Sequence, residues 1–274
     1  MRKHARYLLK KYGIKPKQNL DQYFFVDEKT IRSMIELAGI KKQSRVLEIG
    51  SGLGFLTRQI AEKAGEVIAV EIDQKLVEIL KREYNFGNVK IINKNALKIK
   101  KIGEKCDLLI SSLPYSICEP IFHLMFHSPP KKAVLVVPKR FALRLVGRND
   151  SYSTFSLLAR AFLNTKIIKD VPPQSFYPQP KIISSLIVVE PRKINKEKDR
   201  KAFIVRSLYL QEDKKVKNAL RKIILDLGIK KTRREATELI KSLRIPNHLS
   251  NKKVEHISLE EYLKLVSVIT KAGN

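Results

Sequence analysis

The chain has 274 residues, of which 43% are apolar, enough for one large domain or for a main domain with a smaller one. Its 55 Lys and Arg face 27 Asp and Glu, and this net charge of +28 favours a polyanionic partner such as nucleic acid, or an anionic membrane surface. A heat-adapted surface is also rich in lysine, but its ion-pair networks need both signs of charge, so it does not explain so large an imbalance.

Neither a membrane span nor a secretory signal is expected. The longest apolar runs match the length of a buried strand, and the chain begins MRKHARYLLKKYG, which is basic and lacks an apolar segment. Cys106 and Cys118 are too far apart for a CxxC site, and we expect both to be reduced. We therefore expect a cytoplasmic monomer that has no metal ion and no membrane partner.

After this basic arm, short apolar runs alternate with helical patterns. Asp27 is placed to cap a helix that Gly39 would end, 55–64 is expected to be a helix, and Asp73 is placed to cap the next one. Strands are expected at 45–49, 66–70, 89–92, 107–110 and 133–137. Strands that alternate with helices imply βαβ units and a mainly parallel, doubly wound sheet.

Two further strands, 165–171 and 183–189, flank the segment PPQSFYPQPK and should add a hairpin at the edge of the sheet. Composition changes at Pro191, where a charged connector precedes sequence that is helical throughout. Capping-box patterns occur at TRRE from Thr232 and at SLEE from Ser258. We expect an α/β domain with a basic N-terminal arm over residues 1–190 and a small helical domain over 191–274.

The turn after the first strand is rich in glycine. It runs from Glu48 through Gly50, Gly52 and Gly54, and glycines let a backbone turn tightly and approach a ligand closely. Dinucleotide enzymes carry GxGxxG, whereas ExGxGxG is the pattern of methyltransferases that bind S-adenosylmethionine. Glu71 closes the second strand, where a carboxylate can accept hydrogen bonds from both ribose hydroxyls. The alternative is a glycine turn beside a solvated glutamate.

The segment Ser112, Leu113, Pro114, Tyr115 follows the fourth strand and resembles the (N/D/S)PPY motif of amino-methylating enzymes. The lone pair of adenine's exocyclic amine is delocalised into the ring, so the amine is a poor nucleophile. A polar side chain and a backbone carbonyl that accept its hydrogens can localise that pair toward a methyl donor. An aromatic face such as that of Tyr115 can hold an extruded base by stacking.

With this motif in place, the whole chain resembles the KsgA-type rRNA adenine dimethyltransferases. Segments 20–27, 48–57, 71–73, 94–96 and 112–115 are similar to the motifs LGQNFLxD, EIGPGLGxLT, ELD, GDA and NLPY. The late segment 171–181, VPPQSFYPQPK, is similar to VPxxxFxPxPK, and 214–220 resembles the basic stretch that opens the family's C-terminal domain. The resemblance thus covers nearly the whole chain, in the right order.

The resemblance implies a class I, Rossmann-like methyltransferase fold and transfer of methyl groups from S-adenosylmethionine to two adjacent adenines near the 3′ end of small-subunit rRNA. The partner would be this RNA or a pre-ribosomal particle. Cofactor-contacting positions would be Gln22, Tyr23, Phe25, Glu48, Gly50, Gly52, Gly54, Glu71, Ile72, Asn95, Ala96 and Ser112. Tyr115 and Phe176 would sandwich the target base, although an aromatic residue in a proline-rich loop can also belong to the core.

Departures from the family motifs occur mainly at positions that the resemblance assigns to the cofactor or to the target base. Ser112 replaces Asn with a shorter side chain, and Asn95 replaces Asp with a neutral acceptor. Tyr23 and Phe25 replace Asn or His and Leu, and Arg140 stands where Glu is usual. These changes keep open a weak or inactive relative that acts as an RNA-binding ribosome-assembly factor.

Basic residues recur in the first 20 positions and at 131–132, 139–148 and 214–222. Any one run is typical of a solvated helix face, but together with the net charge they predict a groove that follows phosphates with salt-dependent affinity. This charge disfavours a methyltransferase for small molecules. A nucleotide-linked oxidoreductase is disfavoured by the ExGxGxG spacing and by SLPY.

Overall fold

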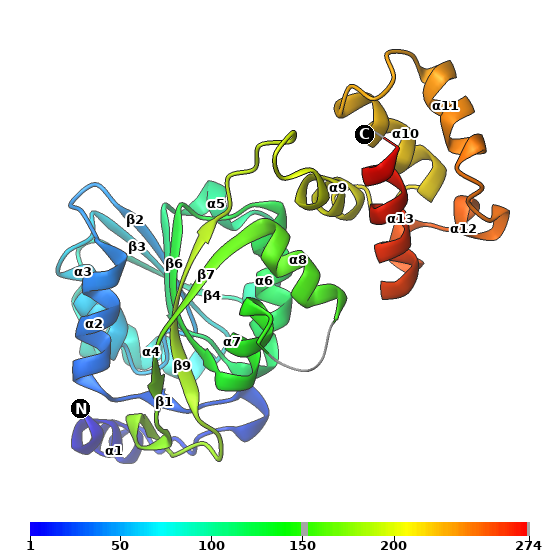
Figure 1. The fold of residues 1–274 in the computed structure, drawn as a ribbon. Coiled ribbons are helices and arrows are strands. Elements are labelled where there is room, and N and C mark those ends of the chain that lie inside the picture. Colours follow the sequence, from blue (N-terminus) through cyan, green and yellow to red (C-terminus); the bar gives the residue numbers. More distant parts are fainter. Residues whose placement is uncertain (149–152, 273–274) are drawn as a thin grey trace. The chain divides into compact units, whose positions relative to one another are not determined.

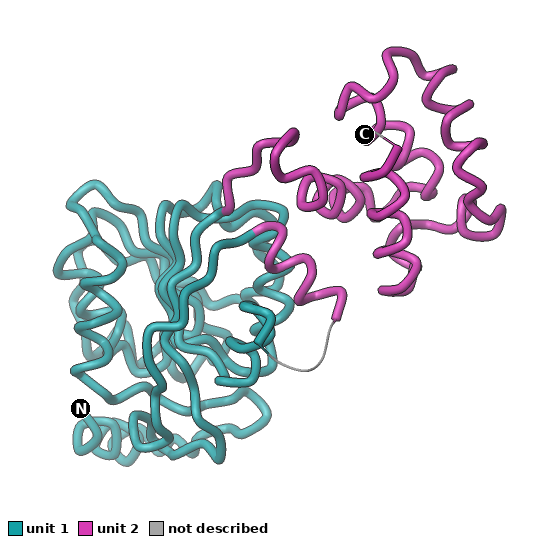
Figure 2. The backbone as a smooth tube through the Cα atoms, in the orientation of Figure 1, with its two compact units in different colours: residues 1–149, 163–191 teal, residues 150–162, 192–274 magenta. Residues whose placement is uncertain are grey.

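The computed structural model describes residues 1–148 and 153–272, and its contacts divide the chain into two compact units (Figure 2). Unit 1 holds Met1–Asn149 and Leu163–Pro191, and unit 2 holds Asp150–Phe162 and Arg192–Asn274. The grouping differs from the expected boundary at residue 190, because helix α8 (Thr154–Phe162) belongs with the C-terminal helices.

Unit 1 is built on a seven-stranded sheet with the order β4-β3-β2-β5-β6-β9-β7 (Figure 1). Its strands are β2 (Arg45–Ile49), β3 (Glu66–Glu71), β4 (Val89–Asn93), β5 (Leu108–Ser112), β6 (Lys132–Pro138), β7 (Leu163–Val171) and β9 (Ser184–Pro191). The first five pair in parallel, whereas β9 pairs antiparallel with β6 and with the edge strand β7. The predicted parallel sheet and its edge hairpin are both confirmed.

Helices lie on both faces of this sheet, with α2 and α3 on one face and α6 and α7 on the other (Figure 1). The helices of unit 1 are α1 (Arg2–Lys11), α2 (Glu28–Ala38), α3 (Phe55–Ala61), α4 (Gln74–Glu83), α5 (Ile102–Lys105), α6 (Cys118–His127) and α7 (Lys139–Val146). The predicted caps are present: the Asp27 carboxylate accepts a hydrogen bond from the Thr30 backbone, the Asp73 carboxylate accepts one from the Lys75 backbone, and Gly39 ends α2 at a φ of 63°.

Two very short strands, one near each end of the sequence of unit 1, pair with each other. β1 (Phe24–Phe25) pairs antiparallel with β8 (Phe176–Tyr177), and this pairing brings the N-terminal motif beside the late motif. The basic arm is helix α1, which buries Ala5, Leu8 and Leu9 in the apolar core. The Arg2 guanidinium also donates hydrogen bonds to the carbonyls of Gln174 and Phe176. The arm is therefore docked on unit 1 through its apolar face, while its other face stays basic and exposed.

The described residues of unit 2 form helices and no strands. They are α8, α9 (Arg200–Tyr209), α10 (Val216–Asp226), α11 (Arg233–Ser242), α12 (Asn247–Asn251) and α13 (Leu259–Lys271). Both predicted capping boxes are present, at the starts of α11 and α13. The Arg206 guanidinium on α9 donates to the Ala161 carbonyl at 2.8 Å and lies 5.1 Å above the Phe162 ring, which ties α8 to α9. Within the described ranges, no helix is both long and apolar enough to cross a membrane.

Candidate functional site

A pocket lies at the carboxyl ends of β2, β3 and β5. In an open parallel sheet this is the point where successive connections turn to opposite faces and where ligands bind. Its lining includes residues 19–25, 48–53, 70–72, 94–96, 112–117 and Phe176. Every residue predicted for the site lines this pocket except Gly54. The fold thus brings together residues as far apart in the sequence as Asn19 and Phe176.

Gly52 and Gly54 have left-handed backbones, with φ of 53° and 80°. A Cβ on Gly52 would lie 3.2 Å from the Phe24 ring, on the side of the pocket formed by the N-terminal segment. A Cβ on Gly54 would lie 2.6 Å from the Leu80 side chain and 2.8 Å from the Tyr84 ring. Gly54 is therefore required by the packing of the loop against α4 and not by close approach of a ligand.

Glu71 anchors the glycine loop to the end of β3. Its carboxylate accepts hydrogen bonds of 2.9 Å from the backbone N–H groups of Gly52 and Asp73. Burial raises the pKa of Glu71, and these backbone hydrogen bonds oppose that rise. Each carboxylate oxygen keeps a further lone pair, which suits a ligand with two adjacent hydroxyls. Beside it, Ile72 is 49% exposed and gives the rim an apolar surface on which a flat ring can rest.

Glu48 and Ser51 form the polar floor of the pocket. Both are buried, and among the described residues Glu48 Oε2 and Ser51 Oγ have no hydrogen-bond partner. Burial raises the pKa of Glu48 to about 8; the nearby Thr57 hydroxyl opposes the rise and the charge of Glu71 adds to it. A buried acceptor without a partner is costly unless a ligand supplies a donor. At neutral pH the Glu48 carboxyl is mainly protonated, so it and the Ser51 hydroxyl can each donate and accept, and the floor fits a polar ligand group that hydrogen-bonds to both.

Gln22 and Asn95 use their side chains mainly within the protein. Gln22 Nε2 donates to the Asp73 carboxylate at 2.8 Å, and its oxygen accepts from the Lys17 backbone. Asn95 Oδ1 accepts a 2.9 Å hydrogen bond from the backbone of Leu97 and so caps the 3₁₀ turn Ala96–Lys98. The Asn95 amide group is left available to the pocket that it lines.

The other half of the pocket is aromatic and surrounds Ser112, the last residue of β5. The Tyr115 ring stacks on the Tyr23 ring, with centroids 5.9 Å apart and planes at 27°. The Tyr115 hydroxyl shares a 2.7 Å hydrogen bond with Ser184, and burial raises the pKa of Tyr115 to about 12. The phenol is therefore neutral at physiological pH.

Phe176 lines the pocket but is only 1% exposed. The Phe25 ring packs against it, with centroids 5.1 Å apart, and the β1–β8 pairing sets these two residues opposite each other. Phe176 thus borders the pocket but is largely covered by neighbouring side chains, Phe25 among them.

Asp21 and Ser184 are site residues that the sequence analysis missed. Asp21 has a left-handed backbone with a φ of 50°, and its carboxylate accepts a 2.7 Å hydrogen bond from the Ser116 backbone. The family motif LGQNFLxD has glycine at this position, and that glycine is the signal for a left-handed turn. Ser184 lies at the start of β9 and comes into contact with Tyr115 only through the sheet, so no local pattern marks it.

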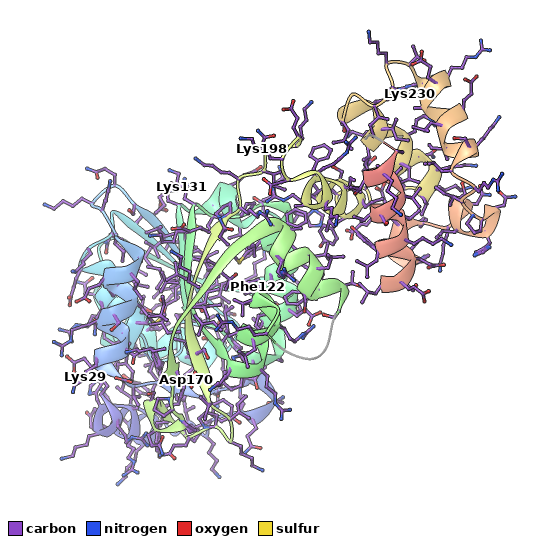
Figure 3. The ribbon with its side chains drawn as sticks, viewed as in Figure 1. Lys29, Phe122, Lys131, Asp170, Lys198 and Lys230 are labelled. Carbon is purple, nitrogen blue, oxygen red and sulfur yellow. The ribbon has the colours of Figure 1, made fainter. Side chains whose placement is uncertain are left out.

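Lys131 and Lys132 lie away from the pocket. Lys131 pairs with Asp107 at 2.8 Å, at the amino ends of β5 and β6, whereas the pocket lies at the carboxyl ends. Figure 3 shows Lys131 and Asp170 at opposite ends of the sheet. Lys139 lies at the pocket end but is paired with Asp170 at 2.6 Å. Arg140 is exposed on α7 and is not part of the pocket lining.

Comparisons with known proteins agree with the resemblance. The profile of the family described as ribosomal RNA adenine dimethylase matches residues 13–271. Proteins described as probable ribosomal RNA small subunit methyltransferase A are similar to this chain: that of Pyrococcus abyssi is 33% identical over 98% of this chain and 100% of its own length, and that of Thermococcus sibiricus is 35% identical over 93% and 92%.

Two crystal structures share the fold. The 23S rRNA methyltransferase ErmE has a TM-score of 0.59 at 21% identity, and it matches 90% of this chain and 99% of its own. A dimethyladenosine transferase from Plasmodium falciparum has a TM-score of 0.59 at 24% identity, with coverage of 91% and 98%. These likenesses confirm the predicted fold class. From the extent of the profile match and the identity to full-length relatives, the chain belongs to the ribosomal RNA adenine dimethylase family.

Proposed function

We propose that this protein transfers methyl groups from S-adenosylmethionine to the exocyclic amines of adenines in small-subunit rRNA, as a step of ribosome biogenesis. The observation that carries this proposal is one pocket in which a glycine loop with two buried glutamates meets the segment from Ser112 to Tyr115. A nucleotide-like methyl donor suits the first half. A base that presents an amine suits the second.

In the donor half, we assign the ribose hydroxyls to Glu71 and the polar methionine end to the floor at Glu48 and Ser51. The unpartnered polar atoms of that floor support the assignment. Ile72, Asn95 and Ala96 would border the adenine of the cofactor. When bound, S-adenosylmethionine supplies a methyl group on a positively charged sulfur, which is already reactive toward an amine.

In the acceptor half, Ser112 and a backbone carbonyl of the following turn would accept the hydrogens of the amine and direct its lone pair to the methyl group. Tyr115 would hold the base by stacking, with its ring orientation set by the hydrogen bond to Ser184. The contribution of the protein is chiefly orientation, which can lower a barrier by several kcal/mol. No general base is assigned, because the proton can leave after transfer.

We further propose that unit 2 contacts RNA. A surface hollow on α10 and α11 is lined by four basic side chains and one acidic one, Glu238, which pairs with Arg234 at 3.1 Å; the basic residues are Arg221, Arg233, Arg234 and Lys241. Such a cluster would bind phosphates without reading sequence, so its affinity should fall steeply with salt. Both cysteines are buried and free, as expected in a reducing compartment, and this supports a cytoplasmic location.

The test is transfer of labelled methyl groups to small-subunit particles that lack the modification, with large-subunit particles as the control acceptor. We expect label in the small-subunit RNA alone. The competing function is an assembly factor with little activity, favoured by the short hydroxyl of Ser112 and the covered face of Phe176. Tight particle binding without label would establish that alternative.

A further inference from the structure

Arg140 carries a positive charge that the surrounding protein does not neutralise. Helix α7 contains three cations and no acidic residue. Two of the cations are paired, Lys139 with Asp170 at 2.6 Å and Arg144 with Glu119 at 2.9 Å. Arg140 is exposed, and within the described ranges its guanidinium has no hydrogen bond or ion pair. It is therefore the cation of α7 that is free to bind an anion.

The start of α7 is held against the segment that leads into β9. The backbone N–H of Lys139 donates to the Ile183 carbonyl at 3.0 Å. The next residue along, Ser184, shares a 2.7 Å hydrogen bond with the hydroxyl of Tyr115. Arg140 follows Lys139 directly, so it lies on the rim of the acceptor half, outside the pocket lining itself.

The same rim exposes two apolar side chains. Ile182 and Ile183 are each 46% exposed, and Lys181 before them is exposed too. Apolar side chains that adjoin positive charge mark an interaction surface, and they suit a nucleotide, which combines a flat ring with a charged phosphate. We call these three residues together with Arg140 the α7 rim.

Charge is distributed unevenly around the acceptor half. Asp21 contacts the backbone of the turn that carries Tyr115, where its carboxylate accepts a 2.7 Å hydrogen bond from Ser116. The α7 rim adjoins Ser184 at the hydroxyl end of Tyr115, and it carries two cations and no acidic residue. A phosphate is repelled on the first side and attracted on the second. An RNA strand whose adenine enters the pocket is therefore best accommodated across the α7 rim.

We propose that Arg140 binds the backbone phosphate next to the target adenine, while Ile182 and Ile183 pack against the flanking nucleotide. This inference rests on the proposed function. A guanidinium suits the role because its planar fork can bind a phosphate through two parallel hydrogen bonds. Glutamate is usual at this position in the family motif and would repel a phosphate. The contact is thus a feature of this chain and strengthens its hold on RNA.

The experiment compares Arg140→Glu and Arg140→Lys with the wild-type protein. Lys63→Glu is the matched control: it makes the same change of net charge at an exposed residue just before β3, at the end of the sheet away from the pocket. Three properties are measured for each protein. They are the binding of unmodified small-subunit particles at several salt concentrations without cofactor, KM and kcat for methyl transfer, and calorimetric affinity for S-adenosylmethionine.

Arg140→Glu should weaken particle binding at low salt by about 10-fold, as loss of a hydrogen bond to a charged group predicts. The loss should appear in KM and not in kcat, because the phosphate lies outside the reacting atoms. The plot of log affinity against log salt concentration should become shallower by about 1. Arg140→Lys keeps the charge and should keep the salt dependence. Cofactor affinity should stay within about threefold of wild type in both variants.

Lys63→Glu should bind particles within about twofold of wild type, since exposed charges more than about 10 Å apart are largely screened. The inference is overturned if Lys63→Glu and Arg140→Glu weaken binding equally, which is an effect of net charge alone. It is also overturned if Arg140→Glu loses cofactor affinity as much as particle affinity.

Ile182→Ser tests the apolar part of the rim separately. It should lower particle affinity by about threefold and leave the salt dependence unchanged, because it removes apolar contact and no charge. Unchanged particle affinity in this variant would overturn the packing of a nucleotide on the isoleucines.

The binding measurements separate this inference from the proposed function. Wild-type protein that labels no RNA, but loses salt-dependent particle binding on Arg140→Glu, keeps the phosphate contact and loses the proposed activity. Wild-type protein that labels RNA, with Arg140→Glu unchanged in particle binding and KM, keeps the activity and loses the inference.

Discussion

The two halves of the pocket are built from different kinds of chemical group. The donor half consists of backbone and buried groups: the N–H groups of Gly52 and Asp73 bind Glu71, and Glu48 lies on a closed floor. The acceptor half consists of side chains that are partly open, with Tyr23 stacked on Tyr115 beside Ser112.

This difference explains part of where the chain departs from its family. The segment from Glu48 to Gly54 keeps the glutamate and the three glycines of its motif, because positive φ angles and buried hydrogen bonds tolerate few residue types, whereas Ser51 and, elsewhere in the donor half, Asn95 differ from the family motifs. The acceptor half carries Tyr23 in place of Asn or His and Ser112 in place of Asn, since open side chains can be exchanged without breaking the backbone. Variants of the donor half should therefore change cofactor binding, and variants of the acceptor half should change transfer alone.

The largest effect is expected from the buried carboxyl of Glu48. Its pKa rises from 4.5 to about 8 in the folded protein, so folding favours the protonated form. This contribution to stability is fully present below pH 4.5 and is lost as pH rises through about 8. Glu48→Gln does not titrate and so does not lose this stability. The difference in free energy of unfolding, variant minus wild type, should therefore increase by on the order of 3 kcal/mol between pH 5 and pH 9.

Denaturant unfolding of the cofactor-free protein at several pH values measures this difference. Glu62→Gln is the matched control, because the Glu62 side chain is 60% exposed. An offset between Glu48→Gln and wild type that stays constant from pH 5 to pH 9 would show that Glu48 is ionised throughout.

The second effect tests the acceptor half. Tyr115→Ala should lower kcat/KM for small-subunit particles by about 100-fold, since a stacking platform is worth 1–3 kcal/mol. Cofactor affinity, measured by calorimetry, should stay within about threefold because the donor half is untouched. Tyr115→Phe keeps the ring and loses only the hydrogen bond to Ser184, so it should remain active. Equal losses of cofactor binding in both variants would contradict the division into halves.

The third effect tests the donor half. Glu71→Ala removes both the proposed ribose contact and the hydrogen bond to the Gly52 backbone. It should weaken S-adenosylmethionine binding by about 30-fold, as loss of a hydrogen bond to a charged group predicts. Glu62→Ala is the control on the protein surface. Unchanged cofactor affinity in Glu71→Ala would show that the ribose does not bind at the end of β3.

The smallest effect concerns Ser112. Ser112→Asn restores the longer amide of the family motif and should raise the single-turnover methyl-transfer rate by about fivefold, through one stronger hydrogen bond to the amine. Cofactor affinity should not change. A rate that falls instead would mean that the pocket is shaped around the serine, with the base held by its aromatic walls.

Local patterns predicted much of this fold. The caps at Asp27 and Asp73 and the strand β2 occur where the sequence places them, because capping and strand periodicity depend on neighbouring residues. The packing of α1 could have been predicted too, since Ala5, Leu8 and Leu9 follow helical spacing. The high charge of this segment indicated only that its exposed face could bind phosphates.

What the sequence could not reveal depends on long-range contacts. Strands β1 and β8 have two residues each and exist only because they pair with each other. The grouping of α8 with unit 2 rests on contacts with α9, such as the hydrogen bond from Arg206 to Ala161, which lies 45 residues earlier in the chain. In the site, the covering of Phe176 by Phe25 and the facing rings of Tyr23 and Tyr115 are tertiary contacts that motif letters do not encode.

The most direct test of the account is nucleoside analysis of small-subunit RNA after incubation of unmodified particles with the wild-type protein and labelled S-adenosylmethionine. The account predicts that the label is recovered in adenosine methylated at its exocyclic amine. Label in a different nucleoside or in ribosomal protein, or saturable particle binding that leaves the RNA unlabelled, would contradict it.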